Sequence, residues 1–402
     1  MTEFVPASRV SRIKSSPSVS AAARVRELKA EGRRILDLTV GEPDFDTPAH
    51  VKDAAAAAIS RGETKYTSVN GTPELQRAIL QTLELKTGLH YTPAEITIGG
   101  GAKQVIFTAF MATLDQGDEV VIPAPYWVSY PDMVLANDGS PVIVPCGEDV
   151  GFKLTPEALA GAITDRTKWL ILNTPSNPTG AVYSREELAA LAAVLEDHPQ
   201  VLVLTDEIYD EIHFGAGKLS SLVAVAPGLK DRVLLVNGVS KAYAMTGWRL
   251  GYGAGPAALV GAINKLQSQI SSCPSSVSQA AAAAALTGDQ SFVRDSLETY
   301  RERRDVAVAA LNAIDGLSCA TPEGAFYAYV NCSGVIGKST REGRLISTDE
   351  DFTLYLLDEV GVAVIQGSAY GLGPYFRISY ATGLPVIEES IAAIDKAVQA
   401  LS

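Results

Sequence analysis

One lysine lies in a segment of mostly small and apolar residues. The segment reads Gly238-Val239-Ser240-Lys241-Ala242, shortly after a β-branched apolar run that ends at Val236. An amine in such surroundings is poorly hydrated, which favours its neutral form and allows it to attack a carbonyl group. Arg249, further along the chain, supplies a guanidinium that suits a phosphate. This combination predicts a site for an aldehyde that carries a phosphate, such as pyridoxal phosphate.

Three further segments follow predicted strands, where an α/β sheet places its ligands. Asn177 lies in a loop of residues that break regular structure. Asp206 stands at the exit of another strand, followed by Tyr209, and a carboxylate there could keep a pyridine nitrogen protonated, as an electron-sink ring requires. The stretch Gly99-Gly100-Gly101-Ala102-Lys103 ends a strand and opens a helix, so its free backbone N–H groups favour an anion such as phosphate.

Each of these segments, taken alone, also has an explanation without a ligand. A glycine-rich turn before a helix is common in α/β proteins, and Asn-Pro-x-Gly is often only a turn. An aspartate at a strand end can cap the next helix, and a lysine after a serine is usually solvated. Four such segments in this order, all at strand ends, favour one shared site over four independent structural features.

Short apolar runs that alternate with helical patterns predict an α/β fold with a mostly parallel sheet covered by helices on both faces. The expected domains are an N-terminal segment (1–48) that joins the small domain, a large cofactor-binding domain (49–290) and a small C-terminal α/β domain (291–402). The predicted strands of the large domain are 96–98, 119–122, 142–144, 169–173, 201–205, 233–237 and 249–254, and predicted helices include 103–114, 184–197 and 256–267.

Composition excludes several classes of partner and location. The net charge of −13 argues against nucleic acid and against an anionic membrane surface, since both would repel the chain. No apolar run is long enough to span a bilayer, and no signal peptide is recognisable, so we expect a cytoplasmic protein. The four cysteines are widely spaced, which fits a reducing compartment, and the four histidines have no metal-binding spacing. No metal site is expected.

These segments together resemble the fold type I, class I aminotransferases of the aspartate aminotransferase kind. The resemblance runs nearly from end to end. It is closest to the bacterial branch that contains aspartate aminotransferases and bifunctional aspartate/prephenate aminotransferases. Besides the segments above, it rests on Gly41 to Pro48, Tyr66 with Asn70-Gly71, Pro125 to Pro131, Gly367 to Gly371, and Phe376-Arg377-Ile378-Ser379.

The resemblance implies pyridoxal 5'-phosphate as cofactor and assigns roles around its ring. Lys241 would attach the cofactor and later move the proton at the substrate Cα. Asp206 would pair with the ring nitrogen, Tyr209 and Asn177 would hydrogen-bond the phenolic oxygen, and Trp127 would stack on the ring.

The resemblance also assigns the groups that hold phosphate and substrate. The backbone of Gly101, Ala102 and Lys103, together with Arg249, would hold the phosphate, and Tyr66 would reach it from the neighbouring subunit of a homodimer. Arg377 would clamp the substrate α-carboxylate, with Gly41 closing over that group and with Trp127 and Asn177 beside it.

Two departures from the family pattern bear on the phosphate and on the substrate. Gly238 stands where many relatives carry a phosphate-binding serine, which leaves open whether Ser240 contributes a hydroxyl. The region 267–278 offers no arginine for a second carboxylate. Two cations are available to bind the second carboxylate of a dicarboxylate: Lys103, and Lys14 in the segment Arg12-Ile13-Lys14-Ser15-Ser16. The alternative is that both are ordinary solvated lysines.

The expected reaction is transfer of the amino group of L-aspartate to 2-oxoglutarate, giving oxaloacetate and L-glutamate. Prephenate or an aromatic amino acid is the closest alternative substrate. A lyase reaction such as β-elimination is a second alternative, because fold and cofactor do not determine which bond at Cα breaks. A ligand sensor with an aminotransferase-like domain would need a DNA-binding extension, and the sequence has no basic helix-turn-helix before the domain.

Overall fold

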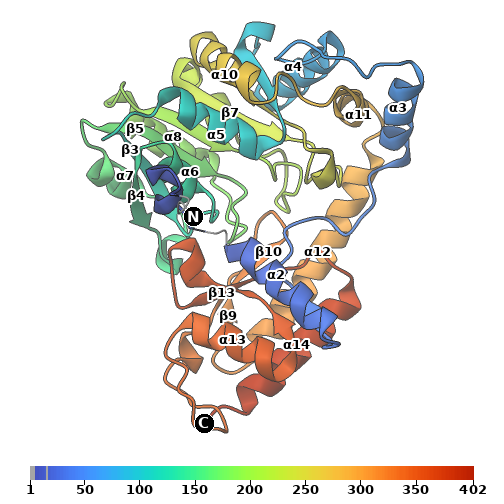
Figure 1. The fold of residues 1–402 in the computed structure, drawn as a ribbon. Helices are drawn as coiled ribbons and strands as arrows, with labels where there is room; N and C mark the ends of the chain where they lie inside the picture. Colours follow the sequence, from blue (N-terminus) through green and yellow to red (C-terminus); the bar gives the residue numbers. More distant parts are fainter. Residues whose placement is uncertain (1–4, 15–16) are drawn as a thin grey trace.

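The computed structural model describes residues 5–14 and 17–402, and its main feature is a seven-stranded sheet with helices on both faces (Figure 1). The strand order is β2-β8-β7-β6-β5-β3-β4. Strands β3 to β7 pair in parallel, whereas β8 runs antiparallel to both β7 and β2. The strand bounds are β2 (Ile96–Gly99), β3 (Glu119–Ala124), β4 (Ser140–Pro145), β5 (Thr167–Asn173), β6 (Leu202–Asp206), β7 (Val233–Gly238) and β8 (Gly251–Ala254).

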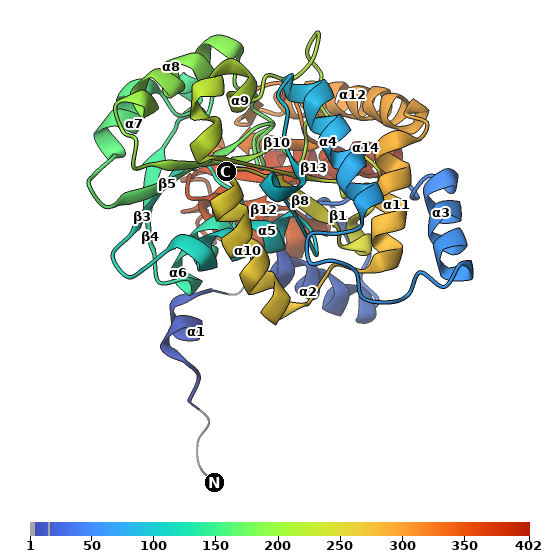
Figure 2. The same ribbon diagram turned by 90° about the horizontal axis from the view of Figure 1, so that it is seen from above.

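Four of the helices around this sheet, α4, α7, α8 and α11, begin at a residue whose side chain caps the helix. Ser184 and Glu187 form a capping box at the start of α8, and Thr155 caps α7. Two alanine-rich helices, α3 and α11, lie side by side (Figure 2) because alanine allows close packing. The helices are α3 (Ala49–Ser60), α4 (Pro73–Thr87), α5 (Ala102–Thr113), α6 (Tyr130–Ala136), α7 (Pro156–Ala162), α8 (Arg185–Glu196), α9 (Leu222–Val225), α10 (Ala257–Ile270) and α11 (Ser276–Thr287).

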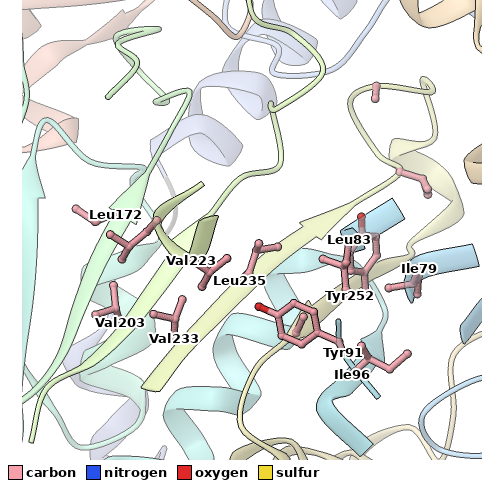
Figure 3. Packing of buried hydrophobic residues seen from close by; sticks show 14 of the residues in the cluster. Ile79, Leu83, Tyr91, Ile96, Leu172, Val203, Val223, Val233, Leu235 and Tyr252 are labelled. Carbon is pink, nitrogen blue, oxygen red and sulfur yellow. The ribbon is translucent and has the colours of Figure 1, made fainter. Parts of the chain in front are cut away.

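Both faces of the central sheet are buried, which explains the nearly continuous apolar runs in its strands. On one face Val203, Val233 and Leu235 pack toward α4 and Tyr252 (Figure 3). On the other face the neighbouring residues Leu204 and Leu234 pack against α5. Burial on both faces holds the strand ends, and the loops that follow them, in fixed positions.

A second sheet lies in the C-terminal part of the chain. Its order is β12-β13-β10-β9, with antiparallel pairing throughout. The long helix α12 (Ser291–Asn312) leads into it, and α13 (Asp349–Val360) and α14 (Leu384–Gln399) pack beside it. The strands are β9 (Ser318–Cys319), β10 (Tyr327–Asn331), β12 (Ile365–Gln366) and β13 (Tyr375–Ser379).

The N-terminal segment packs against this C-terminal part (Figure 1). Helix α2 (Pro17–Ala30) lies over the C-terminal elements, and β1 (Leu36–Asp37) pairs in parallel with β11 (Val362–Ala363). Val25 and Leu28 share a small apolar cluster with Ile35 and Ala363. The exact domain limits given above stay a prediction.

Two details of the predicted strands are wrong. The last strand of the large domain begins at Gly251, and Arg249 lies before it with a left-handed backbone (φ 55°). That turn directs its guanidinium back toward the carbonyls of Thr246 and Gly100. The short strand β9 was not predicted, because two residues carry no periodic pattern. Among the described helices, none combines the length and apolar character needed to cross a bilayer.

Candidate active site

A cavity of about 280 Å³ opens at the carboxyl ends of the central strands, where the C-terminal part and the N-terminal segment cover it. Its lining combines groups from β5, β6 and the turn after β7 with groups from α5 and β13. Eleven of the predicted site residues line it: Gly41, Ala102, Lys103, Trp127, Asn177, Asp206, Tyr209, Ser240, Lys241, Arg249 and Arg377. Segments that are distant in the sequence therefore meet in one place.

Lys241 follows β7 and points its amine into this cavity. Its Nζ donates to the Gly41 carbonyl at 2.6 Å, and the side chain is partly buried. Burial lowers the pKa of Lys241 to about 8; the carboxylate of Glu42 opposes this shift, while Arg249 and Arg377 reinforce it. A substantial fraction of this amine is therefore neutral near physiological pH, which is the state in which an amine attacks a carbonyl or accepts a proton.

Asp206 ends β6 at the floor of the cavity and is 4% exposed. Tyr130 donates its hydroxyl to Oδ2 at 2.6 Å, and the backbone N–H of Ile208 donates to Oδ1 at 3.3 Å. Burial raises the pKa of Asp206, whereas these hydrogen bonds and the positive charge of Lys241 lower it. The Tyr130 hydroxyl thus favours the ionised carboxylate at a site where burial disfavours it.

An anion cradle, made of Gly101, Ala102, Lys103 and Arg249, lies at the start of α5. Gly101 has a left-handed backbone (φ 98°), and a Cβ on it would collide with Arg249 Nη2. Arg249 Nη1 donates to the Thr246 carbonyl at 2.8 Å, and Nη2 donates to the Gly100 carbonyl at 3.2 Å. The guanidinium is therefore fixed beside the free N–H groups of a helix of 12 residues.

Arg377 lies on β13 and is 2% exposed, so its charge is held inside the protein. Its Nη1 donates to Asn177 Oδ1 at 3.0 Å, and its Nη2 donates to the Thr39 carbonyl at 2.6 Å. Its Nε has no hydrogen-bond partner among the described residues. A buried guanidinium without a protein carboxylate on it suits a carboxylate ligand.

Lys103 and Trp127 form the outer edge of the cavity. The Lys103 amine lies 4.6 Å from the centroid of the Trp127 ring and 3.2 Å from Ser129 Oγ. Burial lowers the pKa of Lys103, and the nearby Arg249 lowers it further. Ser240 is 6% exposed and lines the same cavity next to Lys241.

Three predicted residues are not in the cavity lining. Gly101 lies just behind it, in contact with Arg249. Tyr66 is 89% exposed on the surface of this single chain. Lys14 is exposed after the short helix α1 (Ser8–Arg12), and its backbone N–H donates to Asp132 Oδ1. The neighbouring Ser15 and Ser16 lie outside the described residues.

The sequence reasoning missed five polar lining residues. Tyr130 belongs to the motif Pro125 to Pro131, and its proximity to Asp206 was not evident because it depends on how α6 packs. Tyr327 had no signal beyond its place in the apolar run 325–330. The missed residues are Thr39, Tyr130, Asn173, Thr246 and Tyr327. Within the described part of the chain, no cluster of histidine, cysteine and acidic residues is arranged to hold a metal ion.

A family model described as "Aminotransferase class I and II" matches residues 33–394. The chain belongs to this family. This aminotransferase is 52% identical over 399 residues to an aspartate aminotransferase of Rhizobium meliloti (strain 1021), covering 99% of this chain and 97% of the relative. It is 53% identical over 385 residues to an aspartate/prephenate aminotransferase of Cereibacter sphaeroides (strain ATCC 17029 / ATH 2.4.9), covering 96% of each.

A solved structure supports the same assignment. The crystal structure of the aspartate aminotransferase from Rhizobium meliloti matches the aminotransferase with a TM-score of 0.97 at 52% identity, covering 100% of both chains. This match confirms the predicted α/β fold of type I. The predicted enzyme class, a transaminase of the aspartate and prephenate branch, is confirmed as well.

Proposed function

We propose that the chain is a pyridoxal phosphate-dependent aminotransferase that transfers the amino group of L-aspartate to 2-oxoglutarate, giving oxaloacetate and L-glutamate. One observation carries the chemistry: an amine whose pKa is lowered to about 8, Lys241, shares a cavity with the buried carboxylate Asp206 and the buried guanidinium Arg377. Similarity over nearly the whole length to aspartate aminotransferases supports the substrate.

The residues present fit pyridoxal 5'-phosphate. The backbone N–H groups of Gly101, Ala102 and Lys103, together with Arg249, would hold its phosphate, since the Arg249 guanidinium lies beside that helix start and bonds there to the backbone carbonyls of Gly100 and Thr246. Ser240 would add a hydroxyl there. Asp206 would face the ring nitrogen, and Trp127 would cover the ring. When bound, this cofactor supplies an aldehyde and a ring that withdraws electrons from the substrate Cα.

Lys241 would attach the cofactor and move the proton. Its amine would accept the proton from the substrate Cα, which requires a pKa near the working pH. The lowered pKa of about 8 fits this role. The ionised Asp206 keeps the ring nitrogen protonated, and Tyr130 stabilises that ionised form by its hydrogen bond at 2.6 Å.

Two groups would hydrogen-bond the phenolic oxygen. The Asn177 amide accepts from Arg377 through its oxygen, so its NH₂ group remains to donate. Tyr209, which is 4% exposed, lines the same cavity and carries a hydroxyl that can donate. Hydrogen bonds donated to that oxygen would favour its ionised form.

Substrate binding would divide between two cations. Arg377 would take the α-carboxylate as a bidentate pair, and Gly41 would close over that group. Lys103 would take the distal carboxylate, since it lies at the outer edge of the same cavity. Lys14 is the second candidate for the distal carboxylate.

We propose a cytoplasmic homodimer with shared sites. Tyr66 would reach the phosphate of the neighbouring subunit, and its 89% exposure in the single chain leaves it available for that contact. The net charge of −13 supports small-molecule substrates rather than nucleic acid or a membrane surface as partners.

A second candidate substrate is prephenate. The observation that favours it is the 53% identity to an aspartate/prephenate aminotransferase. An aromatic amino acid is a related alternative, and a lyase on the same scaffold is the alternative in reaction type.

The proposal is tested by single-turnover reactions of the cofactor-loaded protein. Aspartate, glutamate, aromatic amino acids and alanine are mixed singly with it while the visible absorption is followed. The aminated form is then mixed with 2-oxoglutarate, oxaloacetate and prephenate. We expect the fastest change with aspartate and recovery with 2-oxoglutarate. Release of ammonia and pyruvate, without an aminated cofactor, would overturn the transferase assignment.

A further inference from the structure

Tyr327 is held in place against the substrate clamp by the pairing of two strands. Tyr329 on β10 is paired in register with Arg377 on β13, and Tyr327 lies on the same face of β10 two residues earlier. Tyr327 is therefore a diagonal neighbour of Arg377 across the strands. The guanidinium carbon of Arg377 lies 4.4 Å from the centroid of the Tyr327 ring, so the cation covers the ring face.

The hydroxyl of Tyr327 reaches the cofactor side of the cavity. Its Oη lies 2.8 Å from Tyr209 Oη, and Tyr327 is only 1% exposed. A Cβ on Gly41 would lie 2.6 Å from the same oxygen, so the backbone of the N-terminal segment closes over it. Tyr327 thus contacts three residues with proposed roles: Gly41, Tyr209 and Arg377.

Which of the two tyrosines donates in this hydrogen bond depends on where each hydroxyl proton points. Each phenol carries one proton and can accept as well as donate. If Tyr209 donates into the cavity, only Tyr327 can donate within the pair. Burial raises the pKa of Tyr327, an effect that Arg377 and the hydrogen bond with Tyr209 partly oppose, so the phenol keeps its proton at neutral pH and can donate it.

We infer that Tyr327 is a positioning residue whose hydroxyl donates to Tyr209 and thereby directs the Tyr209 proton into the cavity. In the proposed function, on which this inference rests, that proton meets the phenolic oxygen of the cofactor. Tyr327 then acts on the cofactor only through Tyr209, while the Arg377 contact holds its ring in place.

The test is a spectroscopic titration of the cofactor-loaded protein. The apparent pKa of the visible absorption band is measured for the wild type, Tyr209→Phe, Tyr327→Phe and the double variant. We expect Tyr209→Phe to raise this pKa, because it removes the hydrogen bond to the ionised oxygen, and Tyr327→Phe to raise it by less, roughly 0.5 unit, because it only weakens that bond by removing the group that donates to Tyr209. The double variant should titrate like Tyr209→Phe alone, since the effect of Tyr327 passes through Tyr209.

Tyr329→Phe is the matched control. Tyr329 is a buried tyrosine on the same strand, and its hydroxyl donates to the carbonyls of Gly367 and Leu372 at 3.1 and 2.5 Å. Its loss should leave the titration unchanged even if it lowers stability. A shift in Tyr329→Phe equal to that in Tyr327→Phe would assign both effects to loosened packing and overturn the inference.

The remaining outcomes separate this inference from the proposed function. If the wild type shows the visible band but Tyr327→Phe leaves its apparent pKa unchanged, the positioning role alone is overturned. The same holds if the pKa shifts of the two single variants add up in the double variant. A wild-type protein that shows no visible band with pyridoxal phosphate overturns the proposed function, and the inference with it.

Discussion

The cavity has a cofactor side, formed by Gly101, Asp206, Tyr209, Lys241 and Arg249, and a substrate side, formed by Thr39, Gly41, Tyr327 and Arg377. On the cofactor side, Asp206 and Lys241 follow β6 and β7, which are parallel neighbours in one sheet. The substrate side is assembled from distant segments: the Arg377 side chain bonds to Thr39, 338 positions away.

This difference has a physical consequence. Adjacent parallel strands place their carboxyl ends at one edge of the sheet, so the local sequence at those ends determines which groups meet. The substrate side depends on the pairing of β10 with β13 and on the N-terminal segment that packs beside them. We therefore expect substitutions on the cofactor side to affect all reactions, and those on the substrate side to affect binding and selectivity.

The largest effect is expected for Lys241→Ala. Loss of the amine removes both the attachment point and the proton carrier, so turnover should fall by roughly 10⁴-fold or more and the visible band should disappear. Steady-state rates and absorption spectra measure this. Lys265→Ala, at an exposed position of α10, is the control and should behave like the wild type. Multiple turnovers by Lys241→Ala would remove the lysine from the centre of the mechanism.

Arg377→Lys is the corresponding test of the substrate side. Lysine keeps the charge but loses the planar fork, and the acceptors on Asn177 and Thr39 lose good partners. We expect kcat/KM to fall by roughly 30-fold, or about 2 kcal/mol, for every amino acid alike. The visible band should persist.

Arg166→Lys serves as control, since its guanidinium pairs with Glu119 away from the cavity. If Arg377→Lys spared monocarboxylic amino acids and impaired only dicarboxylates, the clamp would have to be reassigned from the α-carboxylate to the distal one.

Lys103→Ala should give the clearest difference between dicarboxylate and aromatic substrates. Because its amine lies at the outer edge, over Trp127, we expect roughly a 10-fold loss of kcat/KM with aspartate and 2-oxoglutarate and little change with aromatic substrates. Lys14→Ala compares the second candidate in the same assay. An equal loss of kcat/KM with every substrate would instead assign the Lys103 amine to the phosphate.

The contrast between the two sides also explains what the sequence could predict. Asp206 and Lys241 were predicted because the apolar runs before them identify strands that end beside one another. The apolar pattern of 201–205 and 233–237 corresponds to β6 and β7 within one residue at each end. The roles of Arg377 and Gly41 came only from the resemblance to a family.

The remaining features required three-dimensional packing. Tyr130 reaches Asp206 because α6 folds back over the sheet, and Tyr327 reaches Tyr209 because β10 pairs with β13. Neither contact has a periodic signal in the sequence. Arg249 was predicted to lie within a strand because its apolar neighbours continue the strand pattern. In the structure it adopts a left-handed turn, which is fixed by contacts with Gly100 and Thr246 and leaves no periodic signal.

The smallest effect is expected for Tyr130→Phe on the cofactor side. The carboxylate form of Asp206 is the active one, so activity is lost as the pH falls through its pKa. Burial raises that pKa, and the Tyr130 hydrogen bond counteracts the rise. Removing the hydroxyl should move the acid limb of the pH–kcat/KM profile to higher pH by up to about one unit, with little change at the optimum.

Tyr183→Phe is the matched control for this profile, because Tyr183 is also a buried tyrosine and its oxygen accepts from the backbone N–H of Leu154, outside the cavity. The Tyr130 shift should be the same with aspartate and with an aromatic amino acid, since Asp206 acts on the ring and not on the substrate side chain. A shift that depended on the substrate would show that α6 transmits effects between the two sides, and the division of the cavity into separate sides would then be wrong at this residue.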